Sequence, residues 1–379
     1  MQHRRRKRGL LLPLSAAVAV VAATAGGVAW VWGANDAETT ASTPSEAPAV
    51  ARADCATQGK VPGSGSTAQE NAMKYWIRQY ERACPPVRIA YNPLGSGAGV
   101  VQFMQKSTAF GGTDSPVDPE ENPPDPGVCS GGQVINLPMV GGSIALGYSI
   151  PGVDDLVLDA ETIAKIFDSK ITKWDDPAIR KLNPGAELPS LPIRAVHRSD
   201  DSGTTQNFQA YLAGAAPEVW QHTAEKAWQG KGGESASGST AVATAVASTA
   251  GSIGYFELSF AAARHLTTVR IDTGASEPVA ASAETASAGI AAATVVGKGK
   301  DLTLEFDYRT SADGTYPIVL VSYEIVCETG NAADTLPALK SFLTYTASDA
   351  GQKPLSTIHY APLPESVAAE VRKVVSTLS

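Results

Sequence analysis

Residues 198–205 read Arg198-Ser199-Asp200-Asp201-Ser202-Gly203-Thr204-Thr205. This polar loop joins a β-like run, residues 193–197, to a run in which Phe208, Tyr211 and Leu212 recur at helical spacing. The first backbone N–H groups of a helix have no partner inside the helix, and they carry partial positive charge. A strand that enters a helix through such a loop therefore predicts an anion site.

The side chains of this loop suit the same ligand. Ser202 and Thr204 flank Gly203, which lets a ligand approach the backbone closely. Arg198 supplies a planar fork of donors that matches an oxyanion, and Asp200 is suited to hold that fork in place. The alternative is an ordinary capped helix beside a surface ion pair.

Two further loops repeat this chemistry at the start of a helix. Residues 63–67, Gly-Ser-Gly-Ser-Thr, precede a run with one apolar face, and residues 95–99, Gly-Ser-Gly-Ala-Gly, follow a strand-like run. Thr67 and Glu70 also fit a capping box, which is the structural alternative for the first loop. Three such loops in one chain suggest that the helix starts converge on one anion.

These motifs carry a family resemblance. Together with residues 173–179 and 181–185, the matching segments are residues 63–67, 95–99, 110–114, 198–204 and 251–255. From about Cys55 to its end, the chain resembles the periplasmic-type phosphate-binding protein of ABC phosphate importers. The resemblance implies a receptor that captures inorganic phosphate outside the membrane and hands it to an ABC permease.

The resemblance also implies a set of phosphate ligands. The side chain or backbone contacts would come from Thr67, Ser96, Asp114, Arg198, Ser202, Gly203 and Thr204, with Ala68 contributing its backbone N–H and Asp200 supporting Arg198. The chain departs from the family pattern at Asp201, where a glycine is usual, and at Ala68, where a large aromatic residue is common. We expect the Asp201 side chain to point to solvent, because an inward carboxylate would repel the anion.

Asp114 is the unusual member of this set, because an ionised carboxylate repels an anion. A carboxylate can only accept hydrogen bonds, whereas phosphate near neutral pH still carries a proton and sulfate carries none. Asp114 is therefore predicted to select phosphate over sulfate. The alternative is that Asp114 caps the turn before Ser115 and Pro116.

The charge balance limits the partners. The net charge is −8, and the five basic residues among the first 33 leave −13 for the remainder. Nucleic acids and anionic membrane surfaces are bound largely by summed positive charge, so neither is expected as a partner. An anion would instead need local donors of the kind that the three loops supply.

The chain begins with a basic block and an apolar segment. Residues 1–33 are predicted to be a signal peptide or an uncleaved signal anchor, and we favour the anchor, with the basic end in the cytoplasm. Residues 34–54 are rich in Ala, Thr, Ser, Pro and Glu, which indicates a disordered spacer. No lipobox cysteine precedes Cys55, so we expect no lipid anchor. Both interpretations export the folded part, either tethered to the cell membrane or secreted.

Four cysteines follow in this exported part. An even number suggests two disulfides, and the sequence is compatible with three connectivities. We favour Cys55 with Cys84 and Cys129 with Cys327. The alternative is four free or metal-binding thiols, although no pair has the spacing of a zinc site.

Alternating β and α signals predict open α/β sheets in two lobes with a ligand cleft between them, in a type II periplasmic-binding-protein fold. Lobe I would comprise residues 55–140 and 316–379, and lobe II residues 141–315. A return strand is expected over residues 316–323, with helices over 336–345 and 366–376. The Gly/Ser-rich residues 230–239 suggest a surface loop.

An enzyme is not expected. The Gly-x-Ser-x-Gly elbow of serine hydrolases is missing around Ser202, and His197 at the end of a strand suits a structural role. The five histidines are scattered, so we expect no catalytic metal: His3, His197, His222, His265 and His359. The alternatives are a receptor for another tetrahedral oxyanion and an exported phosphate-ester hydrolase. We expect a monomer without a cofactor.

Overall fold

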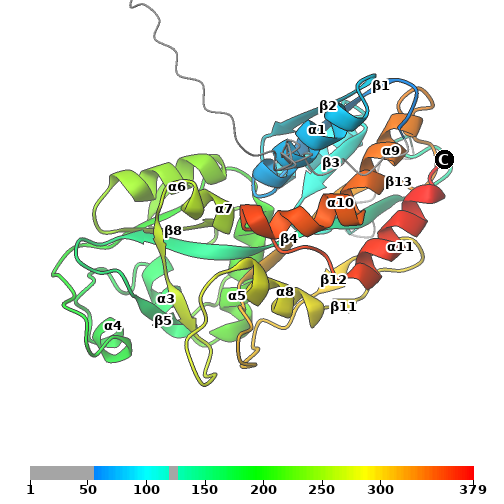
Figure 1. Ribbon diagram of the computed structural model, residues 1–379. Helices are drawn as coiled ribbons and strands as arrows, with labels where there is room; N and C mark the ends of the chain where they lie inside the picture. Colours follow the sequence, from blue (N-terminus) through cyan, green and yellow to red (C-terminus); the bar gives the residue numbers. More distant parts are fainter. Residues whose placement is uncertain (1–54, 119–126) are drawn as a thin grey trace, which may run out of the picture. The chain divides into compact units, whose positions relative to one another are not determined.

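The computed structural model describes residues 55–118 and 127–379 (Figure 1). The predicted signal segment, residues 1–33, and the spacer, residues 34–54, lie outside the described residues. Over the two described ranges, none of the helices combines the length and the apolar character needed to cross a membrane.

The strands form one mixed sheet that continues through both halves of the described chain. Its order is β2-β1-β3-β13-β4-β8-β6-β7, and β9 pairs with β4. The bounds are β1 Gly59–Gly65, β2 Val87–Pro93, β3 Phe110–Thr113, β4 Val134–Ser149, β6 Arg194–Arg198, β7 Glu234–Ala236, β8 Ser252–Glu257, β9 Thr267–Thr268 and β13 Val319–Cys327. Two small pairs lie apart: β5 Val157–Asp159 with β10 Arg270–Asp272, and β11 Thr294–Val295 with β12 Leu304–Glu305.

The long strand β4 joins the two halves. Its first part pairs antiparallel with β13 as far as Ser143, and its second part pairs antiparallel with β8 from Ile144 onward. Fifteen of its sixteen residues are buried, in keeping with a sequence that is apolar or small at nearly every position of this strand. The two predicted sheets therefore share β4 instead of being separate.

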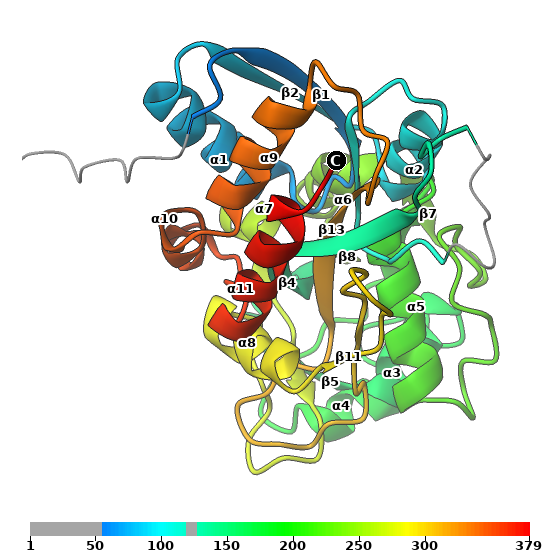
Figure 2. The same ribbon diagram turned by 90° about the vertical axis from the view of Figure 1, so that its right-hand side faces the viewer.

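Helices cover both faces of each half (Figures 1 and 2). On the first half, Phe110 of β3 faces Phe342 of α9 at a ring distance of 6.4 Å, while Ile325 of β13 packs with Phe103 of α2 on the other face. On the second half, α6 packs with Phe256 of β8 and α5 packs on the opposite face. The bounds are α1 Glu70–Ala83, α2 Ser96–Met104, α3 Ala160–Phe167, α4 Pro177–Leu182, α5 Gly203–Ala215, α6 Gly238–Ser248, α7 Leu258–Ala262, α8 Ala283–Ala291, α9 Leu336–Thr346, α10 Asp349–Gln352 and α11 Glu365–Ser376, with the 3-10 turn η1 at Lys353–Ile358.

Two main hydrophobic cores result. The first includes Trp76, Tyr80 and Phe342, and it draws on both ends of the described chain. The second includes Phe167, Phe208 and Tyr255 from the middle of the chain, with Phe208 and Tyr255 stacked at 4.5 Å. Helices α9 and α11, which lie side by side in Figure 2, match the two predicted C-terminal helices within one residue.

The predicted return strand is displaced along the chain. It runs over Val319–Cys327 instead of residues 316–323. Pro317 lies two residues before the first residue of the strand, and a proline has no N–H to donate to a sheet ladder. The strand consequently brings Ser322 and Glu324 into the interior of the sheet, where both are almost fully buried.

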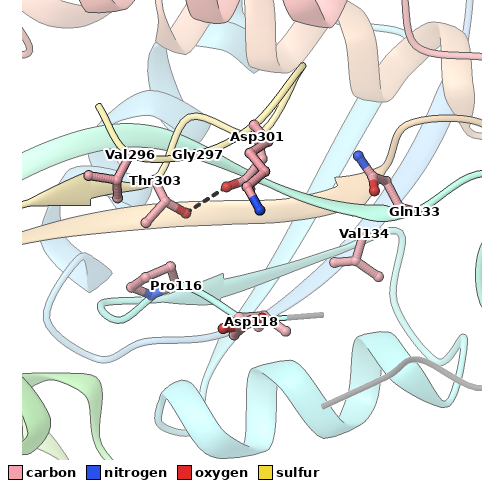
Figure 3. A pocket seen from close by; sticks show the side chains of 10 residues that line it. Pro116, Asp118, Gln133, Val134, Val296, Gly297, Asp301 and Thr303 are labelled. Atoms are coloured by element: carbon pink, nitrogen blue, oxygen red, sulfur yellow. Dashed lines mark hydrogen bonds between the residues drawn. The ribbon is translucent and has the colours of Figure 1, made fainter. Parts of the chain in front are cut away.

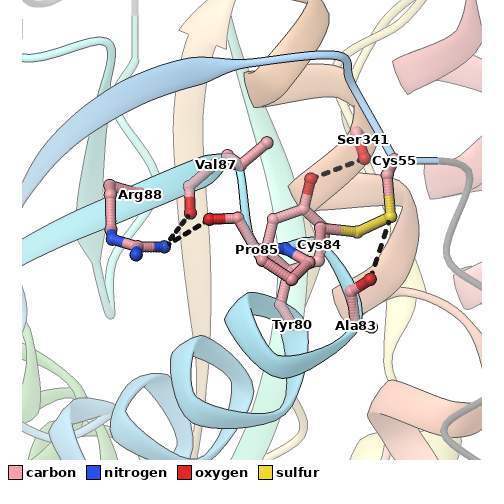
Figure 4. Close-up of a disulfide and its surroundings, with 8 residues drawn as sticks. All are labelled: Cys55, Tyr80, Ala83, Cys84, Pro85, Val87, Arg88 and Ser341. Carbon is pink, nitrogen blue, oxygen red and sulfur yellow. Dashed lines mark hydrogen bonds between the residues drawn. A yellow bond between two sulfur atoms is a disulfide. The ribbon is translucent and has the colours of Figure 1, made fainter.

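The four cysteines form two disulfides. Cys55 pairs with Cys84, which ties the start of the described chain to the end of α1 (Figure 4). Cys129 pairs with Cys327, which ties the loop before β4 to the end of β13. These are the favoured connectivities, and the alternative of free or metal-binding thiols is wrong. Beside the first disulfide, the hydroxyls of Tyr80 and Ser341 lie 2.6 Å apart and join α1 to α9.

Candidate functional site

The starts of α2 and α5 meet at the end of β3. A Cβ atom added to Gly203 would lie 2.7 Å from Ser96 Oγ and 2.8 Å from the Cβ of Asp114. Only glycine fits this position, because such contacts are far inside van der Waals distance. Beside it, the backbone N–H of Gly97 donates to the carbonyl of Asp201 at 2.9 Å. The first turns of two helices from different parts of the chain thus face the same small space.

Arg198 lies at the end of β6 with its guanidinium fixed. The side chain is 2% exposed, and Nε donates to Oδ1 of Asp200 at 2.7 Å while Nη2 donates to Oδ2. Burial raises the pKa of Asp200, but the bonds from Arg198 and from the N–H of Gly238 outweigh it and hold that pKa below its usual value. Nη1 and Nη2 each carry two N–H groups; Asp200 takes one of those on Nη2, and one on Nη1 donates to Ser239 Oγ at 3.5 Å. One N–H on each terminal nitrogen therefore remains for a ligand.

Thr67 does not cap α1. The N-cap residue of that helix is Gln69, which makes no side-chain cap bond. The hydroxyl of Thr67 lies 2.9 Å from Ser239 Oγ and accepts the N–H of Ser239 at 3.1 Å. The capping-box alternative is therefore wrong, and Thr67 joins the N-terminal loop to the first turn of α6.

Asp114 is surrounded by hydroxyl donors. It is 2% exposed, its Oδ1 accepts from Ser66 and from Ser322 at 2.7 Å, and its Oδ2 accepts from Thr204 at 2.9 Å. An ionised carboxylate offers about four acceptor positions, so one position on Oδ2 remains. The next turn is held by Thr113, whose hydroxyl donates to the carbonyl of Ser115 at 2.7 Å. The alternative that the Asp114 side chain caps this turn is therefore wrong.

Ser202 caps α5. Its Oγ accepts the N–H of Thr205 at 3.2 Å, which leaves the hydroxyl proton of Ser202 to donate elsewhere. The hydroxyl of Tyr255 braces this turn, because it lies 2.7 Å from Thr205 Oγ1 and accepts the N–H of Arg198 at 3.1 Å. Capping and ligand binding by Ser202 are thus compatible.

Comparisons with known proteins identify the family of the chain. Residues 50–350 match the family model of the PBP superfamily domain. The chain is 42% identical over 335 residues to phosphate-binding protein PstS 3 of Mycobacterium leprae, covering 88% of this chain and 90% of that relative. It is also 42% identical over 330 residues to phosphate-binding protein PstS 2 of Mycobacterium tuberculosis (strain ATCC 25618 / H37Rv), covering 86% and 89%. The chain belongs to the PstS family of the PBP superfamily.

A solved structure supports the fold of this PstS family member. The chain superimposes on a high affinity periplasmic phosphate-binding protein, PfluDING, with a TM-score of 0.68, 21% identity and coverage of 83% of this chain and 93% of the other. The predicted two-lobed α/β binding-protein fold is confirmed. At this identity the likeness concerns the fold alone.

The two departures from the family pattern have structural outcomes. The Asp201 side chain is exposed, as predicted, while its carbonyl holds Gly97. Ala68 is fully buried, and its N–H donates to Ser66 Oγ at 3.0 Å. The backbone donor expected from Ala68 is therefore engaged within its own loop in this conformation.

The sequence missed several polar residues of the site. Ser239 belongs to the stretch predicted as a surface loop, but residues from Gly238 onward form the first turns of α6. Ser322 lies in the middle of an apolar strand, and Asn207 donates to the carbonyls of Asp114 at 2.7 Å and of Gly203 at 2.9 Å. A fourth glycine-hydroxyl helix start, Gly238-Ser239, could have been recognised; nothing in the sequence signals Ser322 or Asn207 as a contact of Asp114.

Two cavities differ in where they lie relative to the predicted phosphate ligands. One of about 360 Å³ is lined by residues such as Pro116, Asp118 and Thr303, and none of the predicted phosphate ligands lines it (Figure 3). The carboxylate of Asp301 in its wall is held by Thr303 at 2.8 Å. The other, of about 600 Å³, borders the site at Asp114 and Asn207.

Proposed function

We propose that this chain is an extracytoplasmic receptor that binds inorganic phosphate and delivers it to an ABC permease for import. The observation that carries the proposal is the combination of a fixed, buried guanidinium, Arg198, with a buried carboxylate, Asp114, where four helix starts meet. The relatives named phosphate-binding protein support it.

The ligand contacts follow from the donors that remain. Phosphate would accept from the two remaining terminal N–H groups of Arg198, from the N–H groups at the starts of α2 and α5, and from hydroxyls. Its proton would go to the remaining acceptor position on Oδ2 of Asp114. The proposed set is Thr67, Ala68, Ser96, Asp114, Arg198, Ser202, Gly203 and Thr204, with Asp200 supporting Arg198 and Ser239 added from the structure.

Binding would close two lobes over the ligand. We take lobe I as residues 55–140 and 316–379 and lobe II as residues 141–315. The bonds from Gly97 N–H to the Asp201 carbonyl and between Thr67 and Ser239 would then cross the cleft and hold the closed form.

The chain would act without catalysis, as a monomer. Its apolar N-terminal segment, residues 1–33, would export it, and residues 34–54 would form a spacer between the membrane and the folded part. For a hydrolase, Ser202 would need a base. The nearby His197 instead stacks on Trp228 at a ring distance of 5.0 Å, and its Nδ1 lies 2.9 Å from the carbonyl of Arg198.

The test is a calorimetric titration of the purified protein with phosphate and with sulfate. Tight binding of phosphate with no measurable binding of sulfate is expected. Equal binding of both anions would favour a general oxyanion receptor, and turnover of a phosphate ester would return the hydrolase to consideration.

A further inference from the structure

A second buried carboxyl lies behind the anion site. Glu324 on β13 is 1% exposed, and neither of its carboxylate oxygens has a hydrogen-bond partner. Ser322, on the same face of the strand, donates to Asp114. Leaving a buried ionised carboxylate without partners is costly, so this group calls for an explanation.

The side chain of Gln69 covers the same spot from the N-cap of α1. Glu324 stands opposite Gly112 in the β3–β13 ladder, and a Cβ on Gly112 would lie 2.2 Å from Nε2 of Gln69 and 2.4 Å from the hydroxyl of Tyr91. Directly opposite residues of an antiparallel pair share one face, so the Glu324 side chain points toward this pair.

Hydrogen bonding fixes the partner of one N–H of the Gln69 amide. The Tyr91 hydroxyl donates its single proton to the carbonyl of Ser66 at 2.8 Å, so it must accept from Nε2 of Gln69, which lies 3.1 Å away. The amide oxygen, Oε1, is left as an acceptor, and it is buried without a partner. The second N–H of Nε2 is available to an ionised Glu324, whereas only a protonated Glu324 could also supply the donor that Oε1 lacks.

The charges around Glu324 favour that proton. Burial raises the pKa of Glu324 well above the usual value, and the negative charge of Asp114 acts in the same direction. The N–H of the Gln69 amide opposes them, because it would donate to the ionised carboxylate, but burial outweighs it. The other titratable groups of the cluster are Tyr91, whose pKa is raised by burial and by Glu324, and Glu70 beyond it. All of these groups are acids, so an ionised Glu324 would add to a negative field.

We propose that Glu324 carries a proton and donates it to Oε1 of Gln69, which makes Glu324 a positioning residue of the anion site. Three hydrogen bonds connect Gln69 to the anion site: Gln69 donates to the Tyr91 hydroxyl, Tyr91 donates to the carbonyl of Ser66, and the Ser66 hydroxyl donates to Asp114. Neutral Glu324 keeps the Ser66–Thr67 loop in place and keeps a second negative charge away from the anion. Loss of its proton at alkaline pH weakens phosphate binding. This inference rests on the proposed function.

The experiment uses the full chain in the Glu257→Gln background, because Glu257 is another buried carboxyl, and burial raises its pKa to about 8. The infrared carbonyl band of a protonated carboxylic acid is recorded with and without Glu324→Gln. Phosphate dissociation constants of the E257Q protein and of the E257Q/E324Q protein are then measured from about pH 6 to about pH 9.5. Their ratio cancels the titration of phosphate itself.

We expect the acid band near neutral pH and its loss in the E324Q variant. The dissociation constant of the E257Q protein, divided by that of the E257Q/E324Q protein, should rise on the order of tenfold with pH as Glu324 ionises. Glu328→Gln, at the partly exposed end next to the same strand, is the matched control and should leave both band and ratio unchanged. A purely structural role would not give a pH-dependent ratio.

Two results would overturn the proposal: no acid band at neutral pH in the E257Q protein, or a ratio that stays flat while the band disappears with rising pH. If E324Q fails to fold, the band and its pH titration in the E257Q protein, together with its loss in Glu324→Met, decide the question. If phosphate does not bind at any pH but the band is present, the proposed function fails and the proton on Glu324 is still supported.

Discussion

Replacing Arg198 with alanine should remove the strongest donor of the proposed site. The guanidinium is 2% exposed and makes two bonds to Asp200, so the substitution also leaves that carboxylate with the Gly238 N–H as its main remaining bond. A charge-assisted hydrogen bond contributes about 1.5–3 kcal/mol, and two to the anion would amount to about 3–6 kcal/mol. The phosphate dissociation constant should therefore rise on the order of a hundredfold or more.

The matched control lies on the same strand. Arg194 is 53% exposed and pairs with Glu234, which is 54% exposed, so Arg194→Ala removes an equal charge from β6 without touching the site. An exposed pair of this kind contributes about 0–1 kcal/mol to stability and nothing to the ligand contacts. Calorimetry of both variants and of the native protein, with thermal unfolding to check that each is folded, separates the two effects. A dissociation constant for R198A within twofold, roughly, of that for R194A would refute the placement of Arg198 at the ligand.

Three further predictions follow from other parts of the structure. Asp114→Asn should narrow the preference for phosphate over sulfate, because an amide can donate as well as accept; a competition titration with sulfate measures this, and an unchanged preference would contradict the proton-acceptor role. Ser239→Ala removes the hydroxyl bond to Thr67, so it should weaken phosphate binding by roughly 1 kcal/mol. It should also reduce the compaction that solution scattering records on adding phosphate. Identical scattering changes in the variant and the native protein would show that this bond does not hold the closed form. Because burial raises the pKa of Glu257 to about 8, the folded state holds this proton more tightly than the unfolded state does. The free energy of unfolding should therefore fall as pH rises from about 5 to about 8, by up to ~1.4 kcal/mol per pH unit, and Glu257→Gln should remove that contribution; parallel urea-unfolding profiles of the two proteins would show that Glu257 does not titrate in this range.

The parts of the site that the sequence predicts well depend on neighbouring residues. Arg198 and Asp200 are two positions apart, and the strand, loop and helix that contain them form one continuous segment. Helix starts, caps and glycine positions obey rules that act within a few residues, so the sequence alone indicates anion-binding loops and their donors. The spacing of cysteines carries no such local rule, and it left three disulfide connectivities open.

Only the tertiary structure decides what those donors contact. Thr67 fits a capping box in the sequence, but its hydroxyl binds Ser239, 172 residues later in the chain. Asp114 receives a hydroxyl from Ser322 across 208 residues because β13 crosses back to lie between β3 and β4. The same crossing buries Glu324 opposite Gly112.

The physical reason is that local pattern and strand order carry different information. Backbone propensities and caps are set by bonds within one turn or one loop, and they are visible as short motifs in the sequence. The order of strands in a sheet is set by how the apolar faces of distant segments pack together, and many orders satisfy the same pattern of polar and apolar residues. The sequence by itself therefore determined which groups could bind an anion, whereas the packing of β13 and α6 decided which polar side chains surround Arg198 and Asp114.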